Sequence, residues 1–221
     1  MIRLTHVIKM MPGGRRAVND VSLSIREKER ILVHGDPGSG KSVLMRLIAG
    51  MDSPDSGEIR ILDKSVREMN HHTISGFRNR HMGIMLKDPC LLSPMTVLEN
   101  VELPLVIRGI PAARRVQAAK KQIKALGLGH IAHARPDQLS LYEAQAAALA
   151  RALIGEPSIL LLDEVFAGLS PRESEQLAGI IDAAAQFGGL TVILFSASTR
   201  CLMHTDRTIE LDNGIIREDR S

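Results

Sequence analysis

Hydrophobic residues near the start of the chain alternate with polar ones, which is typical of strands that have one exposed face. This pattern covers residues 2–7 and 18–25, and a turn at residues 12–14, rich in Gly and Pro, separates the two segments. A second turn at residues 53–57 precedes a further short strand at 58–62. Short strands close to one another in sequence predict a small antiparallel sheet in this part of the chain.

Continuous apolar runs elsewhere predict the buried strands of a second sheet. Residues 30–34, 158–162 and 191–195 are rich in Ile, Leu and Val, as expected for strands that are covered on both faces. Helical segments follow at 43–50 and 171–187. Strands that alternate with helices favour a mainly parallel α/β sheet.

The part of the chain between about residues 89 and 157 is helical in pattern, and it separates two regions that contain strands. We therefore predict one domain over residues 1–221. Its α/β core, with the small β subdomain, comprises about 1–88 and 158–221, and an inserted helical subdomain comprises about 89–157. The charged residues after Gly214 are expected to lie on the surface.

The segment between the strand at 30–34 and the helix at 43–50 is the most specific chemical signal. It fits the pattern G-x-x-x-x-G-K-[ST], in which backbone N–H groups wrap a polyphosphate and the lysine neutralises its charge. The flanking strand and helix are the required context, because a helix N-terminus attracts an anion. The phosphates of a nucleotide are predicted to bind Gly35, Asp36, Pro37, Gly38, Ser39, Gly40, Lys41, Ser42 and Val43.

Two carboxylates, Asp163 and Glu164, end the apolar strand that begins near residue 158. Asp163 could hold Mg²⁺ together with the Ser42 hydroxyl, and Glu164 could orient or deprotonate a water that attacks the terminal phosphate. Such a pair alone fits an ordinary solvated strand end equally well. Its combination with the phosphate loop favours the functional interpretation.

Composition narrows the classes of partner. The 221 residues include 28 Lys+Arg dispersed among 25 Asp+Glu, and the formal net charge is +3 without a long block of like charge. Aromatic residues make up 2% and Trp is absent, which disfavours a surface that stacks on bases. Nucleic acid is therefore not expected as a partner.

The cysteines and the apolar segments indicate the compartment. Cys90 and Cys201 are far apart without metal-like spacing, so we expect free thiols in a reducing compartment. Charged residues interrupt the first segment, which argues against a signal peptide, and no apolar run approaches the ~18 residues that suggest a membrane span. We expect a cytoplasmic protein, with any membrane role exerted through a partner.

The order of the remaining motifs resembles that of the ATP-binding subunits of ABC transporters, over essentially the whole chain. The matching segments are residues 35–42, 82–85, 91–101, 139–140, 148–153 and 163–164, with Asp206 and Gly214. Residues 77–83 and 99–105 are similar to the branch that serves lipoprotein release, macrolide and peptide export, and cell division.

This resemblance implies a P-loop ATPase cassette that uses ATP and Mg²⁺ at the cytoplasmic face of the inner membrane. The implied fold is a mainly parallel core sheet with flanking helices, a small antiparallel β subdomain and an inserted helical subdomain. The implied partners are transmembrane permease subunits, contacted near Lys87 and Glu99, and a second cassette, identical or different. Met11 stands where the family has an aromatic residue that stacks on adenine; a thioether contacts a ring less strongly.

Other positions depart from the family pattern in parts that act on the γ-phosphate or join the two cassettes. Lys87 stands where the family has a glutamine that contacts Mg²⁺ and water. Glycine lets a backbone approach a ligand closely, and the family's Leu-Ser-Gly-Gly-Gln/Glu signature loses both glycines here. The degenerate positions are Lys87, Ser140, Leu141, Tyr142, Glu143, Ser170 in place of an aspartate, and Ala197 in place of the switch histidine.

Loss of one positioned proton-handling or charge-stabilising group commonly lowers a rate by about 10²–10⁴. We therefore expect the chain to bind ATP with weak or absent hydrolysis. One alternative is a divergent but competent transport ATPase, in which Lys87 counters the charge of the γ-phosphate. Three further interpretations stay open: a pair with a different, complete cassette, a soluble cassette that acts on nucleic acid or ribosomes, and a small-molecule P-loop kinase.

Overall fold

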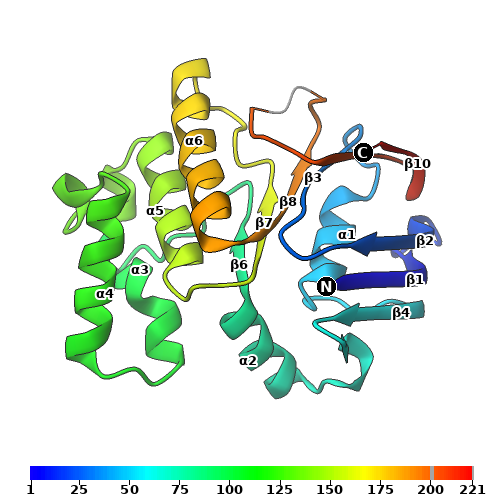
Figure 1. The fold of residues 1–221 in the computed structure, drawn as a ribbon, viewed down its shortest axis with the longest axis horizontal. Helices are drawn as coiled ribbons and strands as arrows, with labels where there is room; N and C mark the ends of the chain where they lie inside the picture. Colours follow the sequence, from blue (N-terminus) through cyan, green and yellow to red (C-terminus); the bar gives the residue numbers. More distant parts are fainter. Residues whose placement is uncertain (200–201, 221) are drawn as a thin grey trace.

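Two sheets form the framework of the protein in the computed structural model, which describes residues 1–199 and 202–220 (Figure 1). The smaller sheet is antiparallel and has the strand order β2-β1-β4-β5. Its strands are β1 (Ile2–Met10), β2 (Arg16–Ile25), β4 (Ser56–Ile61) and β5 (Lys64–Ser65). The prediction of a small antiparallel sheet is confirmed.

The larger sheet has six strands in the order β10-β9-β3-β8-β7-β6. Neighbouring strands from β9 to β6 are parallel, and β10 is antiparallel to β9. The strands are β3 (Arg30–His34), β6 (Met82–Met85), β7 (Ile159–Asp163), β8 (Thr191–Ser196), β9 (Arg207–Asp212) and β10 (Ile215–Arg220). The predicted parallel core is therefore also confirmed.

Helices cover both faces of the larger sheet. Helix α1 (Lys41–Ile48) lies between the two sheets, where Leu44 and Leu47 join a core that includes residues of both. Helix α6 (Pro171–Gly188) packs on the opposite face. Strand β7 is apolar along its whole length because both of its faces are buried. Leu161 belongs to the core between the two sheets, and Leu160 to the core beneath α6.

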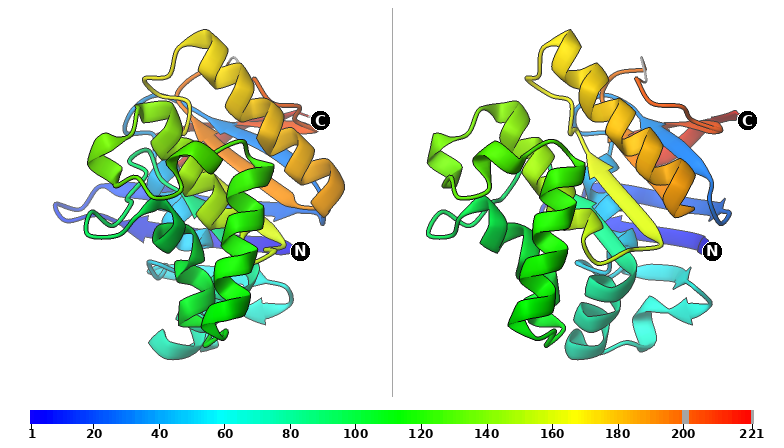
Figure 2. Two further views of the ribbon diagram at one scale, coloured as in Figure 1. Left: turned by 90° about the vertical axis from the view of Figure 1, so that its left-hand side faces the viewer. Right: turned by 60° about the vertical axis from the view of Figure 1, so that its left-hand side comes forward.

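The segment between β6 and β7 is mostly helical (Figure 2). Buried residues of this segment form a hydrophobic core of their own. The segment contains α3 (Val97–Ile107), α4 (Ala112–Ala125) and α5 (Leu141–Leu153), with short 3-10 turns at Gly129–Ile131 and Pro136–Gln138. The small alanines of α5 let it pack against α3 and α4 on one side and against the sheet and α6 on the other. The limits of a helical subdomain at about residues 89 and 157 stay a prediction.

Two further elements precede β6. A 3-10 turn (Val66–Glu68) and α2 (His71–His81) connect the small sheet to the larger one. Helix α2 has only one buried residue, Phe77, so its sequence lacks the apolar stripe by which a helix is recognised. For that reason the pattern of the sequence did not predict this helix.

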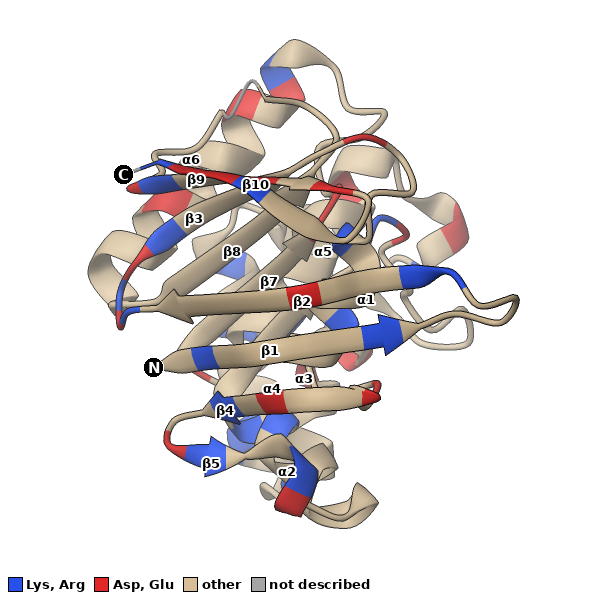
Figure 3. Ribbon diagram, turned by 90° about the vertical axis from the view of Figure 1, so that its right-hand side faces the viewer, with Lys and Arg blue, Asp and Glu red and all other residues tan. Residues whose placement is uncertain are grey.

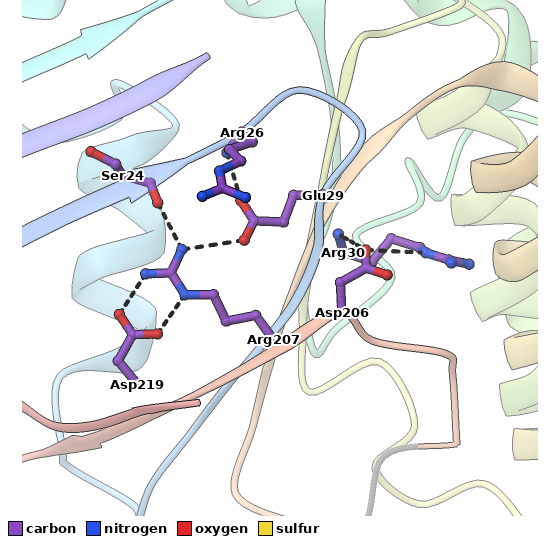
Figure 4. Close-up of polar contacts among 7 residues, drawn as sticks. All are labelled: Ser24, Arg26, Glu29, Arg30, Asp206, Arg207 and Asp219. Carbon is purple, nitrogen blue, oxygen red and sulfur yellow. Dashed lines mark hydrogen bonds and ion pairs between the residues drawn. The ribbon is translucent and has the colours of Figure 1, made fainter. Parts of the chain in front are cut away.

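The charged C-terminal segment lies on the surface, as expected, and forms an edge strand that its sequence pattern did not predict. Its residues 217–220 are exposed, yet β10 pairs with β9 over its length. Arg207 of β9 donates two hydrogen bonds to the Asp219 carboxylate, and further ones to the Ser24 carbonyl at 2.9 Å and the Glu29 carboxylate at 3.2 Å (Figure 4). This arginine links β10 to both sheets, and the hydrogen bonds to Asp219 raise its pKa.

The surface of the described residues carries both basic and acidic side chains, and none of the described helices qualifies as a membrane span. Basic and acidic positions are interspersed over the outer strands (Figure 3). Among the residues that the structure describes, no helix combines the length and the apolar character needed to cross a bilayer. Cys90 is an exposed free thiol, and Cys201 lies outside the described residues.

Candidate functional site

The candidate site lies at the carboxyl edge of the larger sheet. Strands β3, β8 and β7 are adjacent and parallel, and their register pairs His34 with Ser196 and Asp163 with Phe195. The three loops that follow these strands therefore begin side by side. In an open parallel sheet, this edge is where ligands bind.

The phosphate loop occupies the gap between β3 and α1, and two of its glycines are required by close packing. A Cβ atom on Gly40 would lie 2.0 Å from the Ala17 carbonyl oxygen of β2, and one on Gly35 would lie 2.0 Å from the Leu211 carbonyl oxygen of β9. Gly40 also has a φ of 106°, which side chains disfavour. The loop is thus fitted closely to both sheets.

Lys41 is the first residue of α1, and its side chain folds back under the loop. The ammonium donates hydrogen bonds to the carbonyl oxygens of Gly35 at 2.5 Å and Asp36 at 3.1 Å, and the residue is only 6% exposed. No side chain caps the N-terminus of α1, and its first turn has no acidic residue. The first N–H groups of α1 and the Lys41 charge are therefore available to an anion.

Asp163 is buried beside this loop and lacks one hydrogen-bond partner. The residue is 7% exposed, and its Oδ1 atom has no partner among the described residues. Burial raises the pKa of Asp163, whereas the Ser42 hydroxyl, Lys41 and Lys87 act to lower it. An orphaned carboxylate oxygen beside a hydroxyl fits a divalent cation, because Mg²⁺ prefers oxygen ligands.

Lys87 does not fit a divalent cation at the same place. Strand β6 pairs with β7 with Met85 opposite Leu162, so the chain that continues from β6 passes Asp163 and Glu164. An ammonium group has three N–H donors and no lone pair, so it cannot ligate a metal and repels its charge. The full set of residues around Asp163 therefore fits Mg²⁺ only in part.

Glu164 directly follows β7 in a left-handed conformation, with a φ of 51°. Its backbone is held there, since its N–H donates to the Phe195 carbonyl at 2.9 Å and its carbonyl accepts from Ala167 at 3.0 Å. Such a conformation costs about 1–3 kcal/mol in a residue other than glycine and is concentrated at functional sites. The residue lines the cavity beside the loop.

That cavity has a volume of about 590 Å³ and brings together residues from five separate segments. Most of them were predicted from the sequence, although two of these, Lys87 and Ala197, were predicted as degenerate positions. The predicted residues that line it are Met11, Pro37, Gly38, Gly40, Lys41, Ser42, Val43, Lys87, Glu164 and Ala197. The remaining loop residues Gly35, Asp36 and Ser39 lie in the same loop without lining the cavity.

Several residues of the site were not predicted from the sequence. Pro12, Arg15 and Ala17 also line the cavity, and the Arg15 guanidinium donates a hydrogen bond to the Gly38 carbonyl. A basic residue directly after the glycine turn was the available signal for Arg15. Gln145 of α5 is fully buried and donates from Nε2 to the Lys87 carbonyl at 3.0 Å; its signal was a polar residue within an alanine-rich helix.

The N-terminus of α5 contains the segment that was predicted to be a degenerate signature, and this segment does not line the cavity. Ser140 and Glu143 form a capping box: the Ser140 N–H donates to the Glu143 carboxylate at 2.8 Å, and the Glu143 N–H to Ser140 Oγ at 3.2 Å. The hydrogen bond from Ser140 lowers the pKa of Glu143. Leu141 is 43% exposed, and Tyr142 is partly buried against the core beneath.

Two other predicted residues also serve as helix caps outside the cavity. Glu99 accepts hydrogen bonds from Thr96 at the start of α3, from the N–H at 2.7 Å and the hydroxyl at 2.8 Å. Ser170 caps α6 together with Glu173. Within one copy of the chain, Glu99, Ser170 and the signature segment are therefore separate from the phosphate loop.

The chain is similar to a known protein family, to individual members of that family and to solved structures. The family model "ABC transporter" matches residues 18–167. The chain is 33% identical to the lipoprotein-releasing system ATP-binding protein LolD of Chromohalobacter salexigens, over 98% of this chain and 91% of that protein. It is 34% identical to the macrolide export ATP-binding/permease protein MacB 1/2 of Paracoccus denitrificans and 33% identical to the methionine import ATP-binding protein MetN of Brucella abortus.

The last two relatives are longer: the chain spans 33% of MacB 1/2 and 58% of MetN. Among solved structures, the chain is similar to the ATP-binding cassette MJ0796 in a dimeric, post-hydrolysis state bound to ADP and Pi. The TM-score is 0.92 with 28% identity, over 100% of this chain and 98% of that chain. A second dimeric structure of MJ0796, described as a bacterial ABC transporter cassette, has a TM-score of 0.93.

Proposed function

The chain belongs to the ABC transporter family of ATP-binding proteins, and from this we propose that it acts by binding ATP rather than by hydrolysing it quickly. It has the cassette fold. Cassettes of this family bind ATP, generally with Mg²⁺. We propose that this chain holds the phosphates of ATP in the loop of residues 35–43, with Met11 beside the adenine.

One observation carries the proposal: the cavity combines a complete phosphate loop with side chains that are poor at assisting hydrolysis. Lys41 and Ser42 line it together with Lys87 and Ala197. The methyl group of Ala197 can neither donate a hydrogen bond to a phosphate nor hold a water. Each missing group of this kind lowers a rate by about 10²–10⁴, while the loop's own contacts with phosphate are unaffected.

Glu164 is the residue that could still support hydrolysis. It lines the cavity, and we propose that its carboxylate can reach a water beside the terminal phosphate. In the alternative of a divergent but competent transport ATPase, Glu164 is the general base. This alternative and our proposal differ in turnover, not in ATP binding.

We further propose that the chain works as a peripheral subunit at the cytoplasmic face of the inner membrane. Its partners would be transmembrane permease subunits and a second cassette, either identical or different. The names of LolD, MacB 1/2 and MetN describe release, export and import systems, and MJ0796 forms a dimer. Lys87 and Glu99 are proposed to transmit motion between the cassette and the permease.

A cavity of about 380 Å³ between α2, α3 and the end of α5 supports a protein partner on this side. Met51 and Ile107 line it and are 46% and 68% exposed, so two large apolar side chains are accessible to a partner there. A segment of a permease that inserted an apolar side chain there would bury both.

Whether one cassette type or two copurify with the permease distinguishes the homodimer from the heterodimer.

The proposal is tested in the purified complex by measuring ATP affinity and steady-state ATP turnover together. We expect ATP binding with turnover far below the value of about 10 per second that is typical of enzymes. Ordinary turnover that Glu164→Gln abolishes would instead support the competent ATPase. An absence of ATP binding would contradict both forms of the proposal.

A further inference from the structure

We propose that the Lys87 ammonium takes the place of a divalent cation at this site, so that ATP binds about equally well with and without Mg²⁺. This inference rests on the proposed function, because it requires ATP phosphates in the loop of residues 35–42. The property inferred is the Mg²⁺ dependence of ATP binding. Without the charge of Lys87, the complete phosphate loop would be expected to bind ATP better with Mg²⁺ than without it.

The backbone of Lys87 is fixed while its side chain is free. Gln145, which is fully buried, donates a hydrogen bond to the Lys87 carbonyl at 3.0 Å and so ties the segment after β6 to α5. The Lys87 side chain is exposed and lines the cavity with Lys41 and Ser42. Within the described residues it makes no hydrogen bond or ion pair, so its charge is available to a ligand.

The charge of Lys87 acts on the carboxylate that would hold a metal. Asp163 is buried with Oδ1 unpartnered, and it directly follows Leu162, which pairs with Met85 two residues before Lys87. Lys41 is already bound to the carbonyl oxygens of Gly35 and Asp36. Lys87 has no such contact within the described residues, so it is a second cation, in addition to Lys41, that can approach the Asp163 carboxylate or a nearby phosphate.

The two roles of Mg²⁺ beside ATP are affected differently by a lysine. The neutralisation of phosphate charge can be supplied by an ammonium, which forms strong hydrogen bonds with phosphate oxygens. The coordination of the ion needs lone pairs, which an ammonium lacks, and its positive charge opposes a second cation at the same place. Lys87 thus favours ATP and disfavours Mg²⁺.

The test is a calorimetric titration of ATP into the purified full-length chain, in buffer with Mg²⁺ and in buffer with EDTA. For the unmodified chain we expect dissociation constants that agree within about threefold. Lys87→Gln should weaken binding in EDTA by about tenfold and in Mg²⁺ by much less, because the glutamine removes the charge and leaves an amide oxygen. Lys87→Arg should keep the ratio of the unmodified chain.

Lys120→Gln is the matched control, because Lys120 is exposed on α4 and the substitution changes the net charge equally. It should leave both dissociation constants unchanged. Binding by the unmodified chain that is about tenfold or more weaker in EDTA would overturn the inference and leave the proposed function standing. The same ratio in Lys87→Gln as in the unmodified chain would also overturn it, and no binding in either buffer would overturn both.

Discussion

The N-termini of α1 and α5 present the same backbone groups to their surroundings and use them in opposite ways. Each helix begins with N–H groups that have no partner within the helix and that attract negative charge. At α1, Gly40 precedes the helix, and no side chain bonds to these groups. At α5, Ser140 and Glu143 close the end from within, and Leu141 projects beside it.

The free N–H groups at a helix N-terminus can either bind a ligand anion, as we infer for α1, or be capped by side chains of the same chain, as in α5. Helices α3 and α6 also begin with a capping box, formed by Thr96 with Glu99 and by Ser170 with Glu173. The α5 end is thus built like these structural helix ends, and α1 is built differently. We infer that the chain binds phosphate with its own loop and contributes little to a phosphate held by a second copy.

Lys41→Ala breaks the comparison at the open end and should have the largest effect. It removes the charge that lies under the phosphate loop, and a hydrogen bond between charged groups contributes about 1.5–3 kcal/mol. ATP affinity should fall by about 10–100-fold in a calorimetric titration. A thermal unfolding curve serves as the control that the variant is folded, and an unchanged affinity in a folded variant would contradict a phosphate site at α1.

The double substitution Leu141→Gly with Tyr142→Gly opens the closed end. Two small residues let the backbone approach a phosphate of the opposite copy, although each glycine costs the helix about 1 kcal/mol. We expect the ATP-dependent fraction of dimer to increase, with dimer affinity about tenfold higher by analytical ultracentrifugation. Leu141→Ala with Tyr142→Ala is the control for lost apolar contacts, and an equal gain in that control would argue against a steric block.

Asp163→Asn tests how much the buried Asp163 carboxylate, beside the N-terminus of α1, lowers the stability of the ligand-free chain. Burial raises the pKa of Asp163, because the folded environment disfavours the charged form of the carboxyl group. The pKa of Asp163 is higher in the folded state than in the unfolded state. The free energy of unfolding therefore increases as pH falls through the range between these two pKa values. We expect Asp163→Asn to stabilise the ligand-free chain by about 1 kcal/mol in chemical unfolding at pH 7, and to remove this part of the pH dependence.

Glu143→Gln gives the opposite and smallest effect at the closed end. Hydrogen bonding lowers the pKa of Glu143 in the folded state, so its contribution is present at neutral pH and is lost as pH falls through that depressed pKa. The substitution should destabilise the chain by about 0.5 kcal/mol at pH 7, because the cap is weakened and is partly screened by solvent. At acidic pH, where the carboxylate is protonated, the difference from the unmodified chain should disappear.

Local sequence patterns predicted most of the fold because the apolar runs are long and both faces of the larger sheet are buried. The alternating strands β1 and β2 were also evident. Helix α2 and strand β10 were not, since α2 is nearly all polar and β10 is a charged edge strand that pairs with β9 and contacts Arg207. Their positions are decided by tertiary contacts that a local pattern does not contain.

The candidate site was predictable where one motif supplies both chemistry and conformation. The glycines of the phosphate loop are examples, because their spacing alone implies close approach to a ligand. Arg15 and Gln145 were missed because each reaches the site from an element that is distant in sequence. The orphaned oxygen of Asp163 likewise follows from burial by surrounding elements, which the sequence does not display.

The most direct test of the central claim is the identity of the nucleotide that stays bound to the purified complex after a single addition of ATP labelled in both the adenine ring and the γ-phosphate. Rapid removal of free nucleotide, followed by chromatography of the bound fraction over time, measures binding and cleavage together. We predict that the bound nucleotide is retained and is still ATP after many minutes. Conversion to ADP within seconds, or no retained ATP at all, would contradict the account.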